Sequence, residues 1–458
     1  MKTSAFNGPL EAAMRHARAH LDSIDTAPVG ARADAATLRK RLARPLGDAG
    51  VPAAQVVDEL AADVAGGLHV TNSGRFFPWV IGGALPAALA ADWLTSTWDQ
   101  NAHNFAVSPA AAIVEEVAGG WLKELLGVPA SASFAYVTGC QMAHVTSLAA
   151  ARHHVLQRAG WDVEKEGLFG APPIHVVSST HAHGTIDRAL RMLGMGTRNW
   201  TRIPVDERGR LPPAALDAAL ASRPGVPAIV VLNAGDVNTG AFDEFTALIP
   251  IARRHGAWVH VDGAFGLWAA ASPSYRHLTL GMADADSWAT DAHKTLNVPY
   301  DSGLAIVRDP AALVAGFGVE ADYLIGASGD PMERVPEFSR RARGFAVWAA
   351  LRSLGRDGLA VLVDRLCATA SMLAKGFEEV DEVEVVNDVV FTQVMFRLSS
   401  DERTAELGRR LLADGTCVVT PAVWAGRTVQ RCAVSNWSTS EADVAATVAA
   451  VRRVVAAL

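Results

Sequence analysis

The segment ADSWATDAHKTLNVPYDSG, residues 285–303, contains one lysine, Lys294, which lies between a histidine and a threonine. Its neighbours are small or polar, whereas a lysine on a surface helix usually lies among other charged residues. A lysine that forms a Schiff base must be held where its neutral amine is accessible. The surroundings of Lys294 suit such a site better than a solvated helix, but a single lysine does not establish one.

A second segment, HVDGAFG at residues 260–266, precedes the first. Asp262 lies at the end of the apolar run WVHVDG, residues 258–263, which is expected to form a strand. A carboxylate there can pair with the protonated nitrogen of a pyridine ring and make the ring an electron sink. A helix cap or a core ion pair explains an isolated strand-end aspartate better. The lysine on the next strand is what favours the cofactor role.

Strand-like and helix-like segments alternate from about residue 110 to residue 310. The predicted strands cover residues 134–138, 174–179, 228–233, 258–263 and 303–308. Helical patterns lie between them, at residues 147–159, 183–193 and 213–222. This alternation predicts an α/β fold whose sheet is largely parallel, with helices on both faces. Since such sheets bind ligands at the carboxyl ends of their strands, functional residues are expected just after the apolar runs.

Two of these strand ends carry further candidates. Gly139, Cys140 and Gln141 form a turn that leads into a helix, where free backbone N–H groups and the helix dipole favour a phosphate. Cys140 itself is expected to be a packing residue. His183 follows another strand, and its imidazole could stack on a ring or cap the next helix. A phosphate turn, a histidine, an aspartate and a lysine are together the parts that hold pyridoxal phosphate.

The composition restricts the class of protein. The chain has 458 residues, of which 50% are hydrophobic and 19% are charged, and its formal net charge is −7. This length is enough for two or three domains. The absence of a basic stripe argues against a nucleic-acid partner. The start of the chain lacks the apolar core of a signal peptide, and no apolar run of about twenty residues predicts a membrane span.

The cysteines predict a reduced, cytoplasmic enzyme without structural disulfides. Cys140, Cys367, Cys417 and Cys432 form no CxxC pair and have no zinc-finger spacing. The histidines have no cysteine or glutamate at ligand spacing, so no metal site is expected.

Three segments follow from the pattern along the chain. Residues 1–85 are mostly helical and end in the Gly/Pro-rich stretch FFPWVIGGALP. Residues 86–345 contain the alternating strands and helices. Residues 346–458 begin in a long helix and continue as a smaller α+β domain, with strands predicted in VEVVNDVVFTQVMFRL and QRCAVSN.

The segments at residues 285–303 and 260–266 resemble the group II pyridoxal-phosphate-dependent decarboxylases, which include aromatic-amino-acid, histidine and glutamate decarboxylases. The resemblance runs from about residue 69 to the C-terminus. It is specific in Asp291–Lys294 and in His260–Asp262, and looser in the phosphate turn and the far C-terminus. It implies the fold of the aspartate aminotransferase superfamily, pyridoxal 5′-phosphate as cofactor, and a homodimer with active sites at the interface.

The resemblance also implies roles for residues near the cofactor ring. Lys294 matches the Schiff-base lysine, and Asp262 matches the partner of the pyridine nitrogen. Ala264 would pack on one face of the ring, and His183 would stack on the other.

The phosphate would be held by the backbone amides of Cys140 and Gln141 after Gly139, helped by His293. Asp291 lies in the same matching segment and is included among the expected cofactor-binding residues.

The substrate side of the site is implied more loosely. Tyr323 matches a mobile-loop tyrosine that protonates the carbanion after carbon dioxide leaves. Arg431 matches an arginine proposed to meet the substrate carboxylate. The side-chain pocket of the family corresponds to Phe77, Trp79, His103 and Phe105.

Four positions depart from the family pattern. The usual Gly-Thr-Thr near the cofactor is Gly-Asp-Val here, so Asp236 adds a charge that could change the substrate or the reaction. Met142 replaces a glutamate in the phosphate turn, Thr295 replaces an aromatic residue after the lysine, and Gly184 replaces a serine after the histidine.

The function that the resemblance implies is decarboxylation of an L-amino acid, through an external aldimine and a quinonoid, to an amine and carbon dioxide. The aromatic residues of the expected pocket favour an aromatic or apolar side chain. Aminotransfer, carbon–carbon lysis or oxidative deamination to an aldehyde begin with the same cofactor adduct and remain alternatives. A cofactor-binding protein without catalysis is a further alternative, against which the pair Lys294 and Tyr323 argues.

Overall fold

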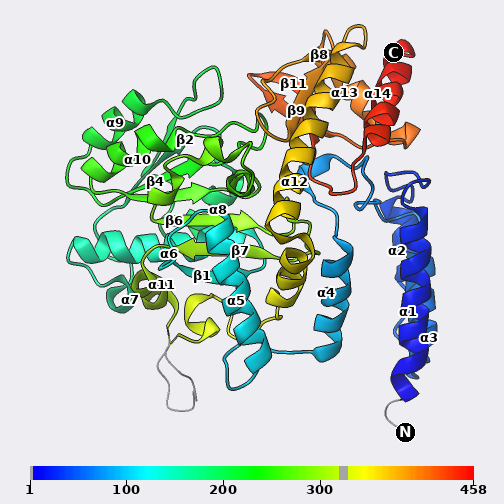
Figure 1. Cartoon of the computed structure of the whole chain (residues 1–458), viewed down its shortest axis with the longest axis horizontal. Coiled ribbons are helices and arrows are strands. Elements are labelled where there is room, and N and C mark those ends of the chain that lie inside the picture. Colours follow the sequence, from blue (N-terminus) through cyan, green and yellow to red (C-terminus); the bar gives the residue numbers. More distant parts are fainter. Residues whose placement is uncertain (1–3, 319–328) are drawn as a thin grey trace.

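The computed structural model describes residues 4–318 and 329–458. Figure 1 shows a central sheet surrounded by helices, a smaller sheet near the C-terminus, and an N-terminal group of helices at the edge of the molecule. The long helix α12 (Gly344–Glu378) runs between the two sheets. It contains one non-helical residue, Gly355, with φ 63°.

The N-terminal helices are α1 (Ser4–Ser23), α2 (Ala35–Leu42) and α3 (Ala53–Asp63). They are followed by η1 (Pro78–Val80), α4 (Pro86–Trp98) and α5 (Pro109–Leu125). A proline occupies the first turn of α4 and of α5, where its missing N–H costs nothing and its fixed φ suits a helix. The segment from residue 64 to residue 85 is largely irregular and leads the chain to the large sheet.

The large sheet has seven strands in the order β1-β7-β6-β5-β4-β2-β3. Its pairs from β3 to β6 are parallel, while β7 is antiparallel to both β6 and β1. The strands are β1 (Ser133–Val137), β2 (His175–Ser179), β3 (Trp200–Ile203), β4 (Ala228–Asn233), β5 (Trp258–Asp262), β6 (Ser287–Asp291) and β7 (Gly303–Val307). The prediction of an α/β fold with a mostly parallel sheet is confirmed.

Both faces of this sheet are covered, which is why its strands are apolar throughout. On β4, Ile229 and Val231 belong to one hydrophobic cluster, which includes residues of α6 and α8. Val230 belongs to another cluster, which includes residues of α9 and α10. The helices of this region are α6 (Cys140–Arg158), α7 (Val163–Glu166), α8 (Gly184–Met192), α9 (Pro213–Ala221), α10 (Phe245–Arg254) and α11 (Pro310–Phe317).

The smaller sheet has four antiparallel strands in the order β10-β11-β9-β8. Its elements are β8 (Glu384–Val385), β9 (Gln393–Arg397), α13 (Asp401–Asp414), β10 (Thr420–Trp424), β11 (Arg427–Ala433) and α14 (Glu441–Ala456). Short 3-10 helices occur at Gly266–Ala271, Arg276–Thr279, Met282–Asp284 and Pro331–Arg334. Within the described ranges, no helix is long and apolar enough to cross a membrane.

Two strands of the large sheet are absent from the predicted set. β6 has the sequence SWATD, which is too polar to be recognised as a strand although all five of its residues are buried. β3 has the sequence WTRI and is short and only partly buried at the sheet edge. The predicted domain boundaries at residues 85 and 345 remain predictions. The second falls within the first turn of α12, whose residues pack against α4 and α5 as well as against α14.

Candidate active site

Most of the predicted cofactor residues line one cavity of about 390 Å³. It lies at the carboxyl ends of the parallel strands, as expected for such a sheet. The predicted residues that line it are Trp79, Gly139, Cys140, Gln141, His183, Asp236, Asp262, Ala264, Asp291, His293 and Lys294. Residues from six segments that are distant in the sequence therefore meet at one site in the folded chain.

Lys294 follows β6 and extends toward the carboxylate at the end of that strand. Its Nζ lies 3.1 Å from Asp291 Oδ2. Burial would lower the pKa of Lys294, but Asp291 and other nearby anions more than offset this and raise the pKa above its usual value. The backbone of Gly82 approaches closely, because a Cβ there would lie 2.2 Å from the Lys294 carbonyl oxygen. The N-terminal segment thus packs directly on the lysine loop.

Asp262 ends β5 and is 7% exposed. Its Oδ1 accepts a hydrogen bond from the Ala264 amide at 3.2 Å, and its Oδ2 lies 3.4 Å from His144 Nε2. Burial alone would raise the pKa of Asp262. The interaction with His144, helped by His183 and Lys294, instead holds the pKa below its usual value. The carboxylate is therefore ionised and suited to pair with a cation.

The start of α6 forms the predicted phosphate cradle. Gly139 precedes this 19-residue helix, and no side chain caps its first turn. A Cβ on Gly139 would lie 3.2 Å from His293, so a larger residue would crowd the cradle. The amide of Cys140 already donates to Asp291 Oδ1 at 2.6 Å. The cradle therefore fits a phosphate at the amide of Gln141, while the Cys140 amide is shared with Asp291.

His293 is fixed in one orientation beside this cradle. Its Nδ1 accepts a hydrogen bond from the Ser302 amide at 3.1 Å, so its proton is on Nε2. Tyr300 stacks on the imidazole with a centroid distance of 4.1 Å, and burial raises the pKa of Tyr300 to about 12. Burial lowers the pKa of His293. The neutral ring presents an N–H donor on the side of Asp291, whose Oδ1 lies 3.5 Å from Nε2.

His183 has one of the two roles that its position suggested, the helix cap. It is the N-cap of α8, and its side chain accepts from the Thr185 amide at 3.3 Å. The imidazole also lines the cavity. Ala264 lines the same cavity, and its small side chain leaves room there for a planar ring. Stacking of His183 on a cofactor ring stays a prediction.

Asp236 has a structural task in its own loop. Its Oδ1 accepts hydrogen bonds from the amides of Asn238 and Thr239, at 3.0 and 2.8 Å, and from the Thr239 hydroxyl at 2.9 Å. Its Oδ2 makes no hydrogen bond within the described residues and lies 3.8 Å from His181 Nδ1. One oxygen therefore holds the turn while the other points to a histidine at the cavity.

The predicted substrate residues are more dispersed. Trp79 lines the cavity and is 56% exposed. Phe77 is buried in the main core, and Phe105 is exposed outside the described cavity. His103 packs edge-on against Phe338, also outside it.

Arg431 lies on β11 and donates to the Val237 carbonyl at 2.6 Å and to Asn238 Oδ1 at 3.1 Å. It therefore supports the Asp236 loop instead of lining the cavity. Tyr323 lies outside the described residues. The roles given to these two residues and to the four pocket candidates stay predictions.

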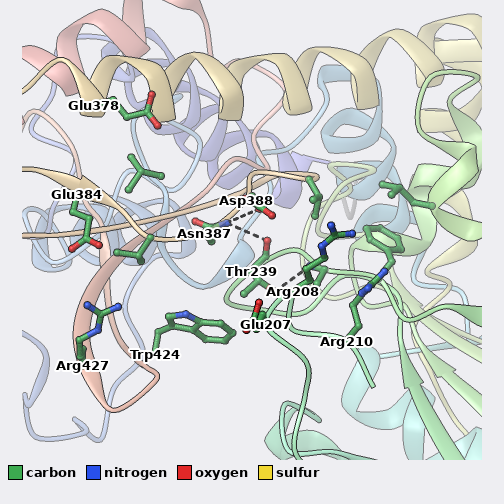
Figure 2. A pocket seen from close by; sticks show the side chains of 16 residues that line it. Glu207, Arg208, Arg210, Thr239, Glu378, Glu384, Asn387, Asp388, Trp424 and Arg427 are labelled. Carbon is green, nitrogen blue, oxygen red and sulfur yellow. Dashed lines mark hydrogen bonds between the residues drawn. The ribbon is translucent and has the colours of Figure 1, made fainter. Parts of the chain in front are cut away.

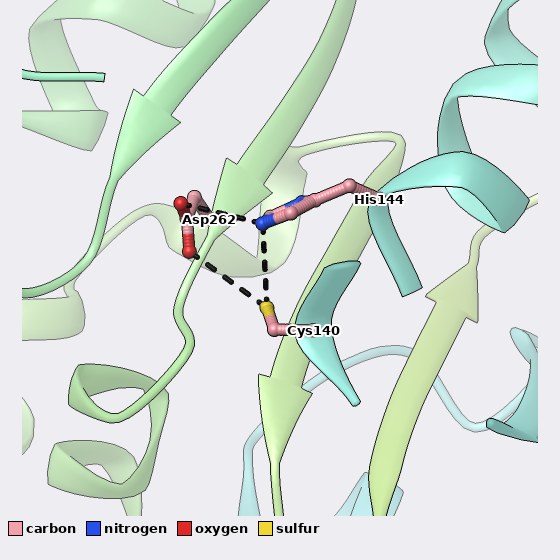
Figure 3. A group of neighbouring side chains, drawn as sticks. All are labelled: Cys140, His144 and Asp262. Atoms are coloured by element: carbon pink, nitrogen blue, oxygen red, sulfur yellow. Dashed lines mark hydrogen bonds and ion pairs between the residues drawn. The ribbon is translucent and has the colours of Figure 1, made fainter. Parts of the chain in front are cut away.

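Three buried groups meet beside the cavity in an arrangement that the sequence analysis did not anticipate. Cys140, His144 and Asp262 place one possible metal-ligand atom each within 4.8 Å of one another (Figure 3). Burial, together with Asp262 and Asp291, raises the pKa of the Cys140 thiol well above its usual value. Cys140 Sγ lies 3.4 Å from His144 Nε2 and 3.9 Å from Asp262 Oδ1, which are hydrogen-bond distances for sulfur. We therefore interpret the group as hydrogen-bonded. The signal for it was the i, i+4 spacing of Cys140 and His144 on one helix.

Another cavity, of about 550 Å³, lies between the large sheet and the smaller one. Figure 2 shows acidic and basic side chains around it, among them Glu207, Arg210, Glu384 and Arg427. Arg210 is ion-paired with Asp206 and with Glu244. The described lining residues of this cavity carry charges of both signs and do not include Lys294.

Comparison with known proteins agrees with this geometry. The family model described as "Pyridoxal-dependent decarboxylase conserved domain" matches residues 38–399. An aromatic-L-amino-acid decarboxylase of Bacillus atrophaeus is 26% identical over 411 residues, which are 87% of this chain and 83% of that protein. A cysteine sulfinic acid decarboxylase of Mus musculus is 30% identical over 357 residues, 74% of this chain and 71% of that protein.

A solved structure has the same fold over nearly the whole chain. The crystal structure of Oryza sativa TDC with PLP and tryptamine superposes with a TM-score of 0.92 at 25% identity. The superposition covers 99% of this chain and 98% of that chain. The extended match places both sheets and the N-terminal helices within one known architecture.

Proposed function

The chain belongs to the pyridoxal-dependent decarboxylase family, and on that premise we propose that it decarboxylates an L-amino acid with an aromatic or apolar side chain. That it is a carboxy-lyase with pyridoxal phosphate as cofactor follows from the family. The observation that carries the substrate proposal is the composition of the cavity wall around Lys294.

Each of the site residues is proposed to have a separate role. When bound, pyridoxal phosphate supplies a protonated pyridine ring that accepts the electron pair of the bond broken at Cα. Lys294 would hold the cofactor through its side-chain amine. Asp262 balances the charge of the ring nitrogen. The N-terminus of α6 and His293 hold the phosphate. Tyr323 is proposed as the donor of the proton that replaces the carboxylate.

The cavity wall favours an uncharged substrate side chain. Its apolar members are Trp79, Val80, Val237, Ala264 and Phe265. Among its described lining residues there is no arginine, and three carboxylates face the site. An acidic side chain would meet repulsion there and find no bidentate partner. Arg431, the nearest candidate, is engaged with the Val237 carbonyl.

Asp236 is proposed to act on the shape of the site and not to redirect the reaction. Its Oδ1 holds the turn that contains Val237, which lines the cavity. A loss of this turn would move the Val237 wall and widen the space for the substrate.

A homodimer is proposed as the working assembly, because apolar side chains remain exposed along the N-terminal helices. Leu21 of α1 and Trp93 of α4 line an apolar groove of about 420 Å³, together with Trp437. A second copy of the chain would cover this surface. A cytoplasmic location is also proposed, since all four cysteines are free.

The test is a mass-spectrometric screen of the purified, cofactor-loaded protein against the common L-amino acids. Conversion of an aromatic or apolar amino acid to its amine, with one equivalent of carbon dioxide, is the expected result. An amine from an acidic amino acid would overturn the substrate class. An aldehyde or a keto acid would overturn the reaction.

The matched variants are Lys294→Ala and Lys165→Ala. Lys165 is exposed and pairs with Asp162 at 2.9 Å, away from the cavity. Loss of turnover and of borohydride-trapped cofactor is expected in Lys294→Ala alone. Full turnover in Lys294→Ala would contradict the assignment of the lysine.

A further inference from the structure

A chain of close polar contacts runs through the buried side of the site and ends at Asp262, where the last contact, with His144, is an ion-pair distance. His144 Nε2 lies 3.4 Å from Asp262 Oδ2 (Figure 3), and His144 Nδ1 lies 2.9 Å from His260 Nε2. His260 Nδ1 in turn lies 2.9 Å from Ser287 Oγ. The indole N–H of Trp258 donates to the same Ser287 Oγ at 2.9 Å. We call Trp258, Ser287, His260 and His144 the relay.

Three elements hold the relay in place. His260 and Ser287 are register partners across the parallel pair β5 and β6. His144 extends from the second turn of α6, and it is fully buried, as are His260 and Ser287. Trp258 begins β5 and is 3% exposed. Because none of these side chains reaches bulk water, each polar atom must be satisfied inside the protein.

The direction of the relay follows from its first member. An indole N–H can only donate, so Ser287 Oγ accepts from Trp258. Among the described residues, the remaining partner of Ser287 Oγ is His260 Nδ1, which accepts a hydrogen bond from the Ser287 hydroxyl. His260 Nδ1 is then an acceptor and its Nε2 carries the proton. By the same step, His144 accepts on Nδ1 and donates from Nε2.

Burial and the neighbouring His144 lower the pKa of His260 to about 3, which keeps its ring neutral and its proton on one nitrogen. The relay therefore delivers one N–H donor to Asp262. Besides the Ala264 amide, which donates to Oδ1 at 3.2 Å, the side chains that face this carboxylate are the Cys140 thiol on α6, His183 before α8, and Lys294 after β6. None of these three makes a hydrogen bond to Asp262 as short as 3.5 Å.

We propose that His144 is a positioning residue that keeps the Asp262 carboxylate ionised and oriented as the partner of the cofactor's pyridine nitrogen. His260, Ser287 and Trp258 fix which nitrogen of His144 carries the proton. The inference rests on the cofactor and not on the proposed substrate. An ionised Asp262 keeps the ring nitrogen protonated, and a protonated ring is the stronger electron sink.

The experiment loads the apo-protein with pyridoxal phosphate labelled with ¹⁵N in the ring and follows its chemical shift against pH without substrate. A second readout is the dissociation constant of the cofactor, from absorbance titration of the apo-protein. In His144→Leu, the ring nitrogen is expected to lose its proton at a lower pH than in the unchanged protein. Cofactor affinity is expected to fall about 10- to 100-fold, by analogy with the loss of a hydrogen-bond partner behind a metal ligand.

Two further variants separate the hydrogen bond from packing. His144→Gln keeps a donor near the position of Nε2 and is expected to recover part of both losses. Ser287→Ala removes the link between Trp258 and His260 and is expected to shift both readouts in the same direction by a smaller amount. If His144→Leu does not fold, these two variants still test the inference.

The matched control is His153→Leu. His153 lies on the same helix but pairs with Glu164 at 2.6 Å, outside the site. The inference would be overturned if His144→Leu and His153→Leu had the same pH midpoint of the ring ¹⁵N chemical shift and the same affinity for the cofactor. Because no substrate is present, this outcome would leave the proposed reaction untouched. A failed amino-acid screen would likewise leave the relay untouched.

Discussion

At the scale of single residues, charge pairing decides the state of the cofactor lysine. The ammonium of Lys294 lies against the Asp291 carboxylate, which raises the pKa of the lysine. A protonated amine cannot attack an aldehyde, so the lysine must lose its proton before the cofactor is held covalently. Asp291 also accepts the Cys140 amide and lies near His293. This one carboxylate therefore organises the lysine and the phosphate cradle together.

Trp79 shows how backbone conformation presents a side chain to the site. Trp79 and Val80 both have positive φ values, 55° and 60°. Such conformations cost non-glycine residues about 1–3 kcal/mol each and are found mainly where the surroundings require them. Here the Trp79 amide donates to Thr420 Oγ1 at 3.2 Å, and the indole lines the cavity.

Trp79→Ala is expected to raise KM for an aromatic substrate. The loss of a large apolar contact of about 1.5 kcal/mol corresponds to roughly a tenfold fall in kcat/KM. Steady-state kinetics with the amino acid identified by the screen would measure it. Phe169→Ala is the control, since Phe169 is 98% exposed and lies outside the cavity. Equal kinetic constants in the two variants would show that the indole does not contact the substrate.

At the scale of elements, the site depends on how closely β7 approaches the start of α6. A Cβ on Gly303, the first residue of β7, would lie 2.4 Å from the Cα of Gly139. Gly303 pairs with Val137 and with Asp291, the last residues of β1 and β6. A glycine at this crossing lets three strand ends and the phosphate turn converge.

Gly303→Ala is expected to push the phosphate turn away and weaken cofactor binding at least tenfold. Overpacking of this kind costs about 1–3 kcal/mol. Cofactor titration of the apo-protein measures the change. The control is Gly120→Ala on α5, where a Cβ meets nothing within 4 Å and alanine favours the helix. Unchanged cofactor affinity in Gly303→Ala would mean that the turn tolerates displacement.

At the scale of the whole molecule, the N-terminal helices present apolar surface that the single chain does not cover. Phe6 and Leu10 of α1 are 66% and 55% exposed, and Leu60 of α3 is 56% exposed. In Figure 1 these helices form a separate group at one side of the molecule. An exposed apolar surface of this kind indicates an interface.

Light scattering after size-exclusion chromatography is expected to give twice the mass of one chain. Trp93→Glu places a charge in the groove lined by Leu21 and Trp437, and it is expected to shift the protein toward the monomer. Val423→Glu is the control, because Val423 is 68% exposed and lies on the smaller sheet. A monomeric mass for the unchanged protein would contradict the dimer.

Buried histidines are expected to make the apo-protein sensitive to acid. Burial lowers the pKa of His175 and of His293, and burial together with His144 lowers the pKa of His260 to about 3. Below about pH 6.5 these histidines are protonated in the unfolded chain but stay neutral in the folded chain. The free energy of unfolding therefore falls as the pH falls. Asp243 acts in the opposite direction between about pH 4 and 6, because burial raises its pKa to about 6. The three histidines outweigh the two carboxylates whose pKa is raised by burial, Asp243 and Asp286.

Urea unfolding of the apo-protein at several pH values between about 7 and 4.5 tests this expectation. The free energy of unfolding should decrease as the pH is lowered. In His175→Gln it should decrease less steeply. Gln can keep the contact that His175 Nε2 makes with Thr201 Oγ1 at 2.9 Å. A pH-independent free energy in the unchanged protein would contradict the prediction.

The fold class and the cofactor follow from the sequence, as do most of the cofactor-site residues that line the cavity. This was possible because apolar runs of the length typical of buried strands place Gly139, His183 and Asp262 just after strand ends, while Lys294 is distinguished by its small and polar neighbours. Four residues expected at the substrate side do not line the cavity: Phe77, His103, Phe105 and Arg431. The polar strand β6 was missed, because its burial comes from its neighbours in the sheet and not from its own composition.

The interactions that these residues make depend on how the chain packs in three dimensions. The relay joins α6, β5 and β6, whose residues are up to 143 positions apart, from His144 to Ser287, so no local spacing reveals it. The sharing of the Cys140 amide with Asp291 and the engagement of Arg431 by the Asp236 loop likewise depend on packing between distant elements. Hydrogen-bond partners are set by register and by helix placement, which the pattern of residues along the chain does not contain.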